Sequence, residues 1–302
     1  MSTTVRLHNH NVSIKGTFLK IASLEQEWYE DLDNPDEMAR SLCDSKSGAD
    51  ILTFWQRLPN LEPKFKFYTE WEEIAALPLT TYEHWWSNQI KSRTRGLIRK
   101  AEKQGLVVKE VEYTDDFVQG ITRIFNESPM RQGRPFWHYG KDFETIKRDF
   151  SRYLFRELLI GAYFNGELVG FMMIGKAGKY AVTGQIISML RHRDKSPTNC
   201  LVAKAVELCV RENMPYLVYL HWGAGAFSEF KRRTGFEKTR LPRYYVPLTA
   251  KGRLALRLGV HNGLVPLLPE SAVARLKQAR GAWYRGLYTL RYPAKMALPE
   301  SE

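Results

Sequence analysis

The first part of the chain alternates loosely between hydrophobic and polar positions before it becomes acidic. The alternation over residues 5–23 predicts two strands. Residues 24–60 predict helical structure around an acidic stretch, with Asn34-Pro35 and residues 45–48 as breakers. Pro59 and Pro63 then indicate a linker, which leads into a further predicted strand at residues 64–68.

A long helical segment is predicted from residue 80. Thr80 and Glu83 have the spacing of a capping box, in which a hydroxyl and a carboxylate satisfy the first free amides of a helix. Apolar residues then recur at helical spacing as far as Gly105, a residue suited to the left-handed conformation that ends many helices. Residues 106–113 predict a strand.

The remaining elements follow in a distinctive order. Two helices over residues 115–156 enclose a polar and aromatic loop, and Asn165-Gly166 gives a strong signal for a hairpin. After it the sequence predicts a strand at 179–190, a helix from Cys200 to about Asn213, a strand at 214–222, a short helix ending at Gly235, and a last strand at 243–249. This order predicts an α+β fold with a mixed, mostly antiparallel sheet flanked by helices.

The composition is that of an ordinary folded protein. The chain has 302 residues, of which 44% are hydrophobic and 26% charged, enough for one large domain or two small ones. No apolar run approaches the ~20 residues of a membrane-spanning helix, and the N-terminus lacks the apolar core of a signal peptide. Cys43, Cys200 and Cys209 are widely spaced, so we expect a cytoplasmic protein without a disulfide scaffold or a metal site.

Positive charge is concentrated in two segments. The net charge is +12, yet residues 1–60 carry a net charge of −3. Residues 91–109 hold seven basic residues and one acidic residue, and residues 251–302 hold nine and three. Such asymmetry predicts attraction to a nucleic acid, a phosphorylated small molecule or a membrane surface, and it is equally typical of a solvated basic face.

A basic turn precedes the predicted helix at Cys200. Free amides at a helix N-terminus carry partial positive charge and suit a phosphate or pyrophosphate. The side chains that would bind the phosphate are Arg191, Arg193, Lys195, Ser196, Thr198 and Asn199. The same pattern is consistent with an exposed basic turn that Ser196 caps, with Pro197 at the first helical position.

The loop at residues 126–143 is the best candidate for a binding site. Aromatic side chains beside arginines recognise sugars, bases or phosphates. Its candidate residues are Arg131, Arg134, Trp137, His138, Tyr139 and Lys141, together with Glu127. Tyr244 in the last strand is a further candidate, either as part of a sheet edge or as the lining of a cleft. The alternative is an ordered loop that its aromatic residues anchor to the core.

The order of the C-terminal elements resembles the GNAT acyltransferase fold. Residues 166–174 (GELVGFMMI) are similar to the hairpin of that fold, and residues 230–236 (FKRRTGF) to its last short helix. Residues 92–108 (SRTRGLIRKAEKQGLVV) resemble the Fem-type branch, in which two GNAT-like halves transfer aminoacyl groups from tRNA.

The resemblance covers about residues 80–250 and implies a division of the chain. Residues 1–79 would form a degenerate first half, residues 80–250 the acyltransferase core, and residues 251–302 a basic helical tail. It also implies an acyl-CoA or aminoacyl-tRNA donor, an amine acceptor and no metal. The turn at 191–199 lacks glycine and contains Pro197, which has no amide hydrogen, so it departs from the usual CoA-binding pattern.

Acyl transfer to an amine requires removal of a proton and stabilisation of the carbonyl oxygen. His221, at the end of a predicted strand, is the best base by type and position, although a solvent-facing histidine is the simpler interpretation. Lys231 stands where the resemblance implies a tyrosine acid, and a desolvated lysine can exchange protons. Glu127 is the third catalytic candidate, and the loop at residues 126–143 is the best candidate for the acceptor site.

Two other interpretations belong to different functional classes. The first is a nucleic-acid-binding protein without catalytic activity, which would use Trp85, Trp86 and the basic residues Arg93, Arg95, Arg99 and Lys100. The second is a scaffold on a GNAT-like fold that has lost its activity. The basic tail, with apolar residues from Leu254 to Val260 around Arg253 and Arg257, also predicts a peripheral contact with an anionic membrane. Its apolar positions are equally consistent with packing onto the domain.

Overall fold

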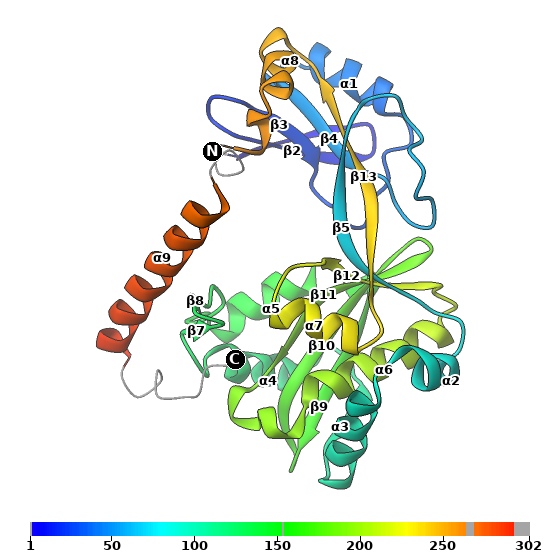
Figure 1. Ribbon diagram of the computed structural model, residues 1–302, viewed down its shortest axis with the longest axis vertical. Helices are drawn as coiled ribbons and strands as arrows, with labels where there is room; N and C mark the ends of the chain where they lie inside the picture. Colours follow the sequence, from blue (N-terminus) through cyan, green and yellow to red (C-terminus); the bar gives the residue numbers. More distant parts are fainter. Residues whose placement is uncertain (1, 153, 264–268, 293–302) are drawn as a thin grey trace. The chain divides into compact units, whose positions relative to one another are not determined.

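The computed structural model describes residues 2–152, 154–263 and 269–292. The chain divides into two compact units (Figure 1). Unit 1 contains Met1–Ile74 and Thr239–Val273, and unit 2 contains Ala75–Lys238 and Ala274–Glu302. The sequence predicts boundaries at residues 79 and 250 instead. The division of the structure differs because two long strands, β5 (Tyr68–Pro78) and β13 (Glu237–Pro247), each have residues in both units.

Unit 1 is built on a sheet with the strand order β1-β2-β3-β4-β13-β5. Its other strands are β1 (Ser2–Leu7), β2 (His10–Lys15), β3 (Ile21–Leu24) and β4 (Ile51–Trp55), and its helices include α1 (Pro35–Asp44) and α8 (Ala250–Arg257). The purely helical prediction for residues 24–60 is wrong at β4. All five residues of this strand are buried, so it shows no alternation that would reveal a strand.

Tyr244 lies inside the core of unit 1. Its side chain is fully buried, and its ring packs between Phe54 and Phe65. The hydroxyl donates a 2.6 Å hydrogen bond to Gln56 Oε1 and accepts one of 2.8 Å from the backbone N–H of Lys64. The residue expected to bind substrate therefore has a packing role in this structure.

The sheet of unit 2 has the order β5-β12-β11-β10-β9-β6. Its strands are β6 (Val107–Glu110), β9 (Glu157–Phe164), β10 (Glu167–Ala177), β11 (Tyr180–Ser188) and β12 (Tyr216–His221). The predicted hairpin is confirmed, since Asn165 (φ 49°) and Gly166 (φ 80°) form the turn between β9 and β10. The predicted α+β class with a mixed, mostly antiparallel sheet is also confirmed.

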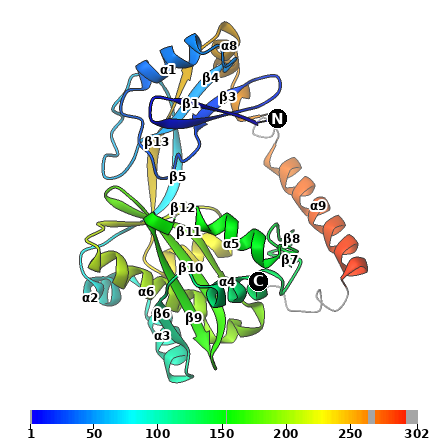
Figure 2. The ribbon, with the colours of Figure 1, turned by 180° about the vertical axis from the view of Figure 1, so that it is seen from behind.

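Helices cover both faces of this sheet (Figure 2). They are α4 (Asp115–Phe125), α5 (Phe143–Ser151), α6 (Pro197–Arg211) and α7 (Ala226–Arg233). Phe171 of β10 packs on Phe117 and Phe125 of α4, whereas Gly170 lies against Leu201 of α6. Adjacent residues of a strand point to opposite faces, so α4 and α6 enclose the sheet between them.

The helical segment predicted from residue 80 is broken into α2 (Tyr82–His84), a π-helical turn (Trp85–Gln89) and α3 (Ser92–Lys103). Its first turn is capped by Thr81, whose hydroxyl accepts the N–H of His84, so the prediction of Thr80 as the cap is wrong. Arg95 donates to the carbonyls of Trp86 and Ile90 and so closes the break. Gly105 has the predicted positive φ, 89°.

Shorter elements complete the described chain. They are the hairpin strands β7 (Met130–Arg131) and β8 (Arg134–Pro135), the 3-10 turns η2 (Leu154–Arg156), η3 (Leu190–Lys195) and η4 (Val260–Asn262), and the C-terminal helix α9 (Glu270–Arg291). None of the helices described is both long and apolar enough to cross a bilayer.

Candidate functional site

Strands β11 and β12 part after two residue pairs. They run parallel and pair only at Ala181 with Leu217 and at Val182 with Val218. Beyond these pairs β11 continues to Ser188, bound to β10 on its other side. The main-chain groups on the β12 side of residues 183–188 therefore face an opening between two strands of one sheet.

Local irregularities in both strands explain why they part at this point. The register between β10 and β11 shifts so that Met173 faces Gln185 while Ile174 faces Thr183, which makes Gly184 an extra residue in β11. Such a bulge bends the strand that carries it. In β12, Leu220 has φ 44°, a conformation that side chains other than glycine's adopt at a cost. Each strand is thus bent just after its last shared pair.

The basic turn and the start of α6 follow directly from the open strand. Ser196 adopts the left-handed conformation (φ 49°, ψ 43°), and no side chain caps the first turn of α6. The N–H groups of Asn199 and Cys200 point back to the carbonyl of Ser196, at 3.1 and 3.5 Å, and Pro197 has no N–H. The helix start therefore offers an anion few backbone donors. The side chain of Thr198 contacts that of Ser188 through a 3.2 Å hydrogen bond.

Two cations of the turn are paired with acids in this structure. Arg191 forms an ion pair with Glu167, and Lys195 lies 2.9 Å from Asp194 and over the ring of Phe164. Arg193 is exposed. The predicted phosphate-binding residues thus do lie together at one end of β11, but part of their charge is already balanced.

Glu127 connects the predicted acceptor loop to this turn. Its carboxylate accepts the backbone N–H groups of Leu190 (2.7 Å) and Arg191 (3.1 Å), and its side chain is only 6% exposed. It also pairs with Arg131 at 3.1 Å. Because the carboxylate is nearly buried and its oxygens already accept two amides and pair with a guanidinium, the geometry gives Glu127 a positioning role.

Arg131 completes the connection. Its guanidinium donates to the carbonyl of Ser188 at 2.7 Å and to that of Ile124 at 3.1 Å, and it lies over the ring of Phe136. Burial lowers the pKa of Arg131, and the Glu127 carboxylate opposes this shift. Glu127 and Arg131 therefore connect the predicted phosphate-binding turn to the predicted acceptor loop at the end of β11.

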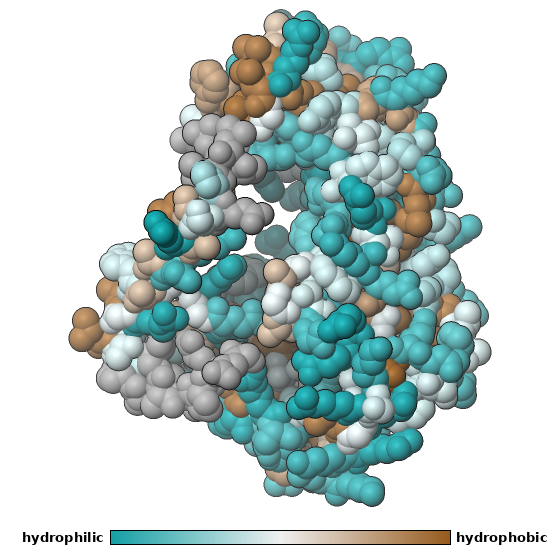
Figure 3. Space-filling view, viewed as in Figure 1, coloured by the Kyte–Doolittle hydropathy of each residue, from teal (hydrophilic) through white to brown (hydrophobic). Residues whose placement is uncertain are grey.

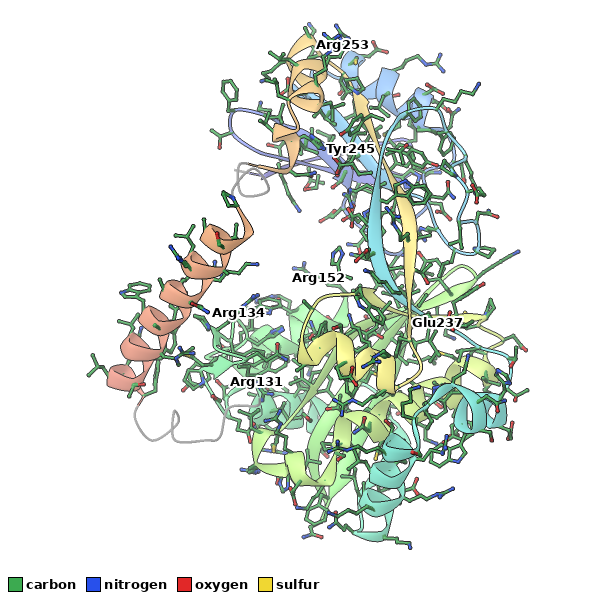
Figure 4. All side chains as sticks on the ribbon, viewed as in Figure 1. Arg131, Arg134, Arg152, Glu237, Tyr245 and Arg253 are labelled. Carbon is green, nitrogen blue, oxygen red and sulfur yellow. The ribbon has the colours of Figure 1, made fainter. Side chains whose placement is uncertain are left out.

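The rest of the acceptor loop presents exposed groups. Arg134 is exposed on the β7–β8 hairpin, where Figure 4 also shows Arg131. Trp137 is 70% exposed, and Lys141 lies over its ring at 4.6 Å while pairing with Asp149 at 3.1 Å. The ring of Tyr139 packs against Tyr292. This side of the loop has the aromatic and cationic surface expected of a binding site.

His138 has no such exposure. It is buried, its ring stacks on Phe125 at 4.1 Å and contacts Trp137 at 3.7 Å, and neither ring nitrogen has a hydrogen-bond partner in the structure. Burial, together with the charge of Lys141, lowers the pKa of His138 to about 4. The imidazole is neutral at pH 7 and anchors the loop rather than meeting a ligand.

Lys231 of α7 is fully buried, and its side chain lies beside the end of β12. Its ammonium donates to the carbonyl oxygen of His221 and lies over the rings of Tyr219 (4.5 Å) and Phe227 (4.0 Å). Burial lowers the pKa of Lys231 to about 8. Because its partners enclose it, Lys231 holds the bent end of β12 in place, and the exposed side chain of His221 is the catalytic candidate that a substrate can reach there.

Sequence reasoning missed the residues that shape the opening. Gly184 and Leu220 bend the two strands, and Ser188 contributes both its carbonyl and its hydroxyl to the contacts around the turn. A glycine within a strand pattern is a signal for a bulge. The conformation of Leu220 has no such signal, because leucine is common in regular strands.

Basic residues of α3 lie beside the turn. The helix packs next to η3, and Arg93, Lys100 and Lys103 are exposed on it. Arg99 lies over the ring of Trp86 at 5.5 Å, while the neighbouring Trp85 is buried and donates to the carbonyl of Thr234. The exposed basic residues of α3 thus lie on a helix that contacts the basic turn before α6.

No family model and no curated protein matches the sequence. Solved structures that match include the C-terminal domain of a protein named as a lysylphosphatidylglycerol synthetase from Agrobacterium fabrum, with a TM-score of 0.58, 13% identity and coverage of 86% of this chain and 88% of that one. FemX matches with a TM-score of 0.55, 10% identity and coverage of 85% and 90%. L-PGS from Bacillus licheniformis matches with 0.52, 12% and coverage of 78% and 80%. At these identities the likeness establishes a shared fold.

The contact between Glu127 and Arg131 should be strongly coupled. We expect Glu127→Gln or Arg131→Met alone to lower the free energy of unfolding by about 3 kcal/mol, because each leaves a buried charge without its partner. The double variant should cost about 1–3 kcal/mol less than the sum of the single variants. Urea unfolding of the four proteins measures this coupling. The exposed pair of Lys147 and Asp115 is the control, where the same cycle should give little or no coupling because solvent screens both charges. Equal coupling in the two pairs would contradict the assignment.

The buried imidazole of His138 should make the protein sensitive to acid. Its pKa is about 4 in the folded state and near 6.5 when exposed, so the unfolded chain binds the extra proton first as the pH falls. The resulting loss of stability begins near pH 6.5 and reaches about 3 kcal/mol near pH 4. We expect His138→Phe to remove this part of the pH dependence, measured by urea unfolding between pH 7 and 4. A slope that is unchanged from that of the parent protein would show that His138 is not its source.

Proposed function

Starting from the GNAT/Fem-type fold of this chain, we propose that it is an acyltransferase. It moves an acyl or aminoacyl group from a carrier that bears phosphates to an amine. The observation that carries the proposal is the parting of β11 and β12 after Val182 and Val218, with the basic turn at one end of the open strand. An opening of this kind lets a carbonyl group lie against exposed backbone N–H groups.

Two observations favour an aminoacyl-tRNA over CoA as the donor. The start of α6 offers few backbone amides to a pyrophosphate, because Pro197 has none and the next two amides after Thr198 point to Ser196. The exposed basic residues of α3, by contrast, lie on a helix that contacts the turn, and a polyanion can bind the cations of both elements at once. The Fem-type resemblance of residues 92–108 implies the same donor.

The reaction would proceed by attack of the amine nitrogen on the carrier's carbonyl carbon. The nitrogen loses a proton, the carbon–oxygen bond to the ribose breaks, and the leaving hydroxyl takes up a proton. Backbone N–H groups of residues 183–188 would stabilise the carbonyl oxygen. His221 would accept the proton from the amine, while Lys231 and Glu127 act as positioning residues at the ends of β12 and of the turn.

The candidate acceptor surface is the exposed side of the loop at residues 126–143. Asn126 closes the base of the loop by donating to the carbonyl of Lys141 (3.0 Å) and accepting the N–H of Gly140 (2.8 Å). Trp137 and the nearby cations then present a firm aromatic and basic surface, which suits an acceptor with a sugar, a base or a phosphate next to its amine.

A donor screen tests the proposal. The full chain is incubated with charged tRNAs and, separately, with acyl-CoAs, and mass spectrometry follows the carried group. We expect consumption of aminoacyl-tRNA and none of CoA thioesters. His221→Gln should lower the rate about 100-fold or more without changing the melting temperature, whereas His84→Gln, at another exposed histidine, should leave both unchanged. If no donor is bound or consumed, the assignment as an enzyme is wrong and a nucleic-acid-binding or scaffold role replaces it.

A further inference from the structure

Helix α9 carries a continuous apolar stripe. On a helical projection, six residues fall within an arc of roughly 80° over the whole 22-residue helix. They are Ala272, Leu276, Ala279, Trp283, Leu287 and Leu290. The rest of the circumference holds polar, basic, tyrosine and glycine residues, apart from three small or branched apolar positions, so the helix is amphipathic.

The large side chains of this stripe are open to solvent. Leu276 is 61% exposed, Trp283 63% and Leu290 86%. Figure 3 shows brown, apolar atoms at the outer edge of this helix in the lower left of the view. Large apolar side chains that are exposed along one side of a helix mark a surface that binds a partner or a membrane.

From Ala274 onward the helix belongs to unit 2, and it contacts this unit through a different face. Gly281, Tyr284 and Tyr288 are its half-buried residues in the second half. Gly281 lies against the backbone of Gly133 in the β7–β8 hairpin, and Tyr288 packs on Tyr292, which in turn contacts Tyr139. These contacts lie roughly opposite the stripe on the projection, so they hold the helix in place with its apolar side turned outward.

Arginines border the stripe on both sides. Arg275 lies along one border, and Arg280 and Arg291 lie along the other. The helix has five basic residues and a single acidic one, Glu270. An apolar face with cationic borders is the pattern of helices that lie in the surface of an anionic bilayer, where the apolar side chains enter the acyl region and the guanidinium groups bind lipid phosphates.

We propose that α9 docks this unit on an anionic membrane surface through the stripe from Ala272 to Leu290. Charge decides the choice of partner. A second copy of the helix, packed stripe to stripe, would bring the bordering arginines of both copies together with almost no acidic residues to balance them. An anionic bilayer supplies both the apolar region and the compensating charge.

The docking has a consequence for the candidate site. Because α9 contacts the β7–β8 hairpin through the side opposite the stripe, membrane binding would hold the loop at residues 126–143 about 10 Å, one helix diameter, from the side that enters the bilayer. This consequence rests on the proposed function of that loop. The docking itself does not, because it requires no donor and no transfer activity.

Co-sedimentation of the full chain with lipid vesicles tests the proposal. We expect binding to vesicles that contain phosphatidylcholine with phosphatidylglycerol, at least about tenfold stronger than to phosphatidylcholine alone. The double variant Leu287→Ser with Leu290→Ser should lower the partition coefficient about tenfold or more. Arg280→Gln with Arg291→Gln should have an effect of similar size and weaken the dependence on salt.

The control is Gln278→Ser with Thr289→Ser, two exposed positions outside the stripe, which should bind vesicles as the parent protein does. Melting temperatures of all variants show whether each is folded. Equal binding to the two kinds of vesicle, or unchanged binding of the leucine variant, would overturn the proposal. So would light scattering that shows a dimer which the leucine variant abolishes, because the stripe would then be a surface between copies.

Discussion

Strands β11 and β12 share only two residue pairs, and the main candidates for function lie around the point where the strands separate. A sheet that stayed fully paired would use its backbone N–H groups internally and leave none for a carbonyl. The bulge at Gly184 and the positive φ of Leu220 end the pairing, and Lys231 holds the bent end of β12. The opening is therefore maintained by three residues from different elements, Gly184 of β11, Leu220 of β12 and Lys231 of α7.

Beside this opening, a buried ion pair connects elements that are separate in the sequence. Glu127 and Arg131 fasten the loop after α4 to the end of β11 and to the turn before α6. Taking two charges out of water is costly, and good geometry with satisfied hydrogen bonds is needed to offset that cost. Here the carboxylate has two backbone donors besides the guanidinium, which meets this condition. For this reason the predicted phosphate-binding turn and the predicted acceptor loop are held together.

The uneven charge of the sequence has a spatial counterpart. The exposed basic residues of α3 lie on a helix that contacts the basic turn before α6, whereas the positive charge of α9 borders an apolar stripe. The first arrangement suits a polyanion such as RNA, because exposed cations are spread over two neighbouring elements. The second suits a bilayer, since cationic side chains border a continuous apolar stripe on both sides. The same net charge thus supports two different kinds of contact.

Local sequence determined the parts of this protein that depend on neighbouring residues. The turn at Asn165-Gly166, the positive φ of Gly105, the order of strands and helices after residue 115, and the basic turn before α6 all follow from short-range conformational preference. Tertiary structure alone decided the burial of His138 and Tyr244, and the pairing of Glu127 with amides 63 and 64 residues away. It also decided that β11 and β12 part. These features depend on which distant groups meet in space, and a side chain's type does not specify its partner when the energies of solvent and of internal contacts nearly balance.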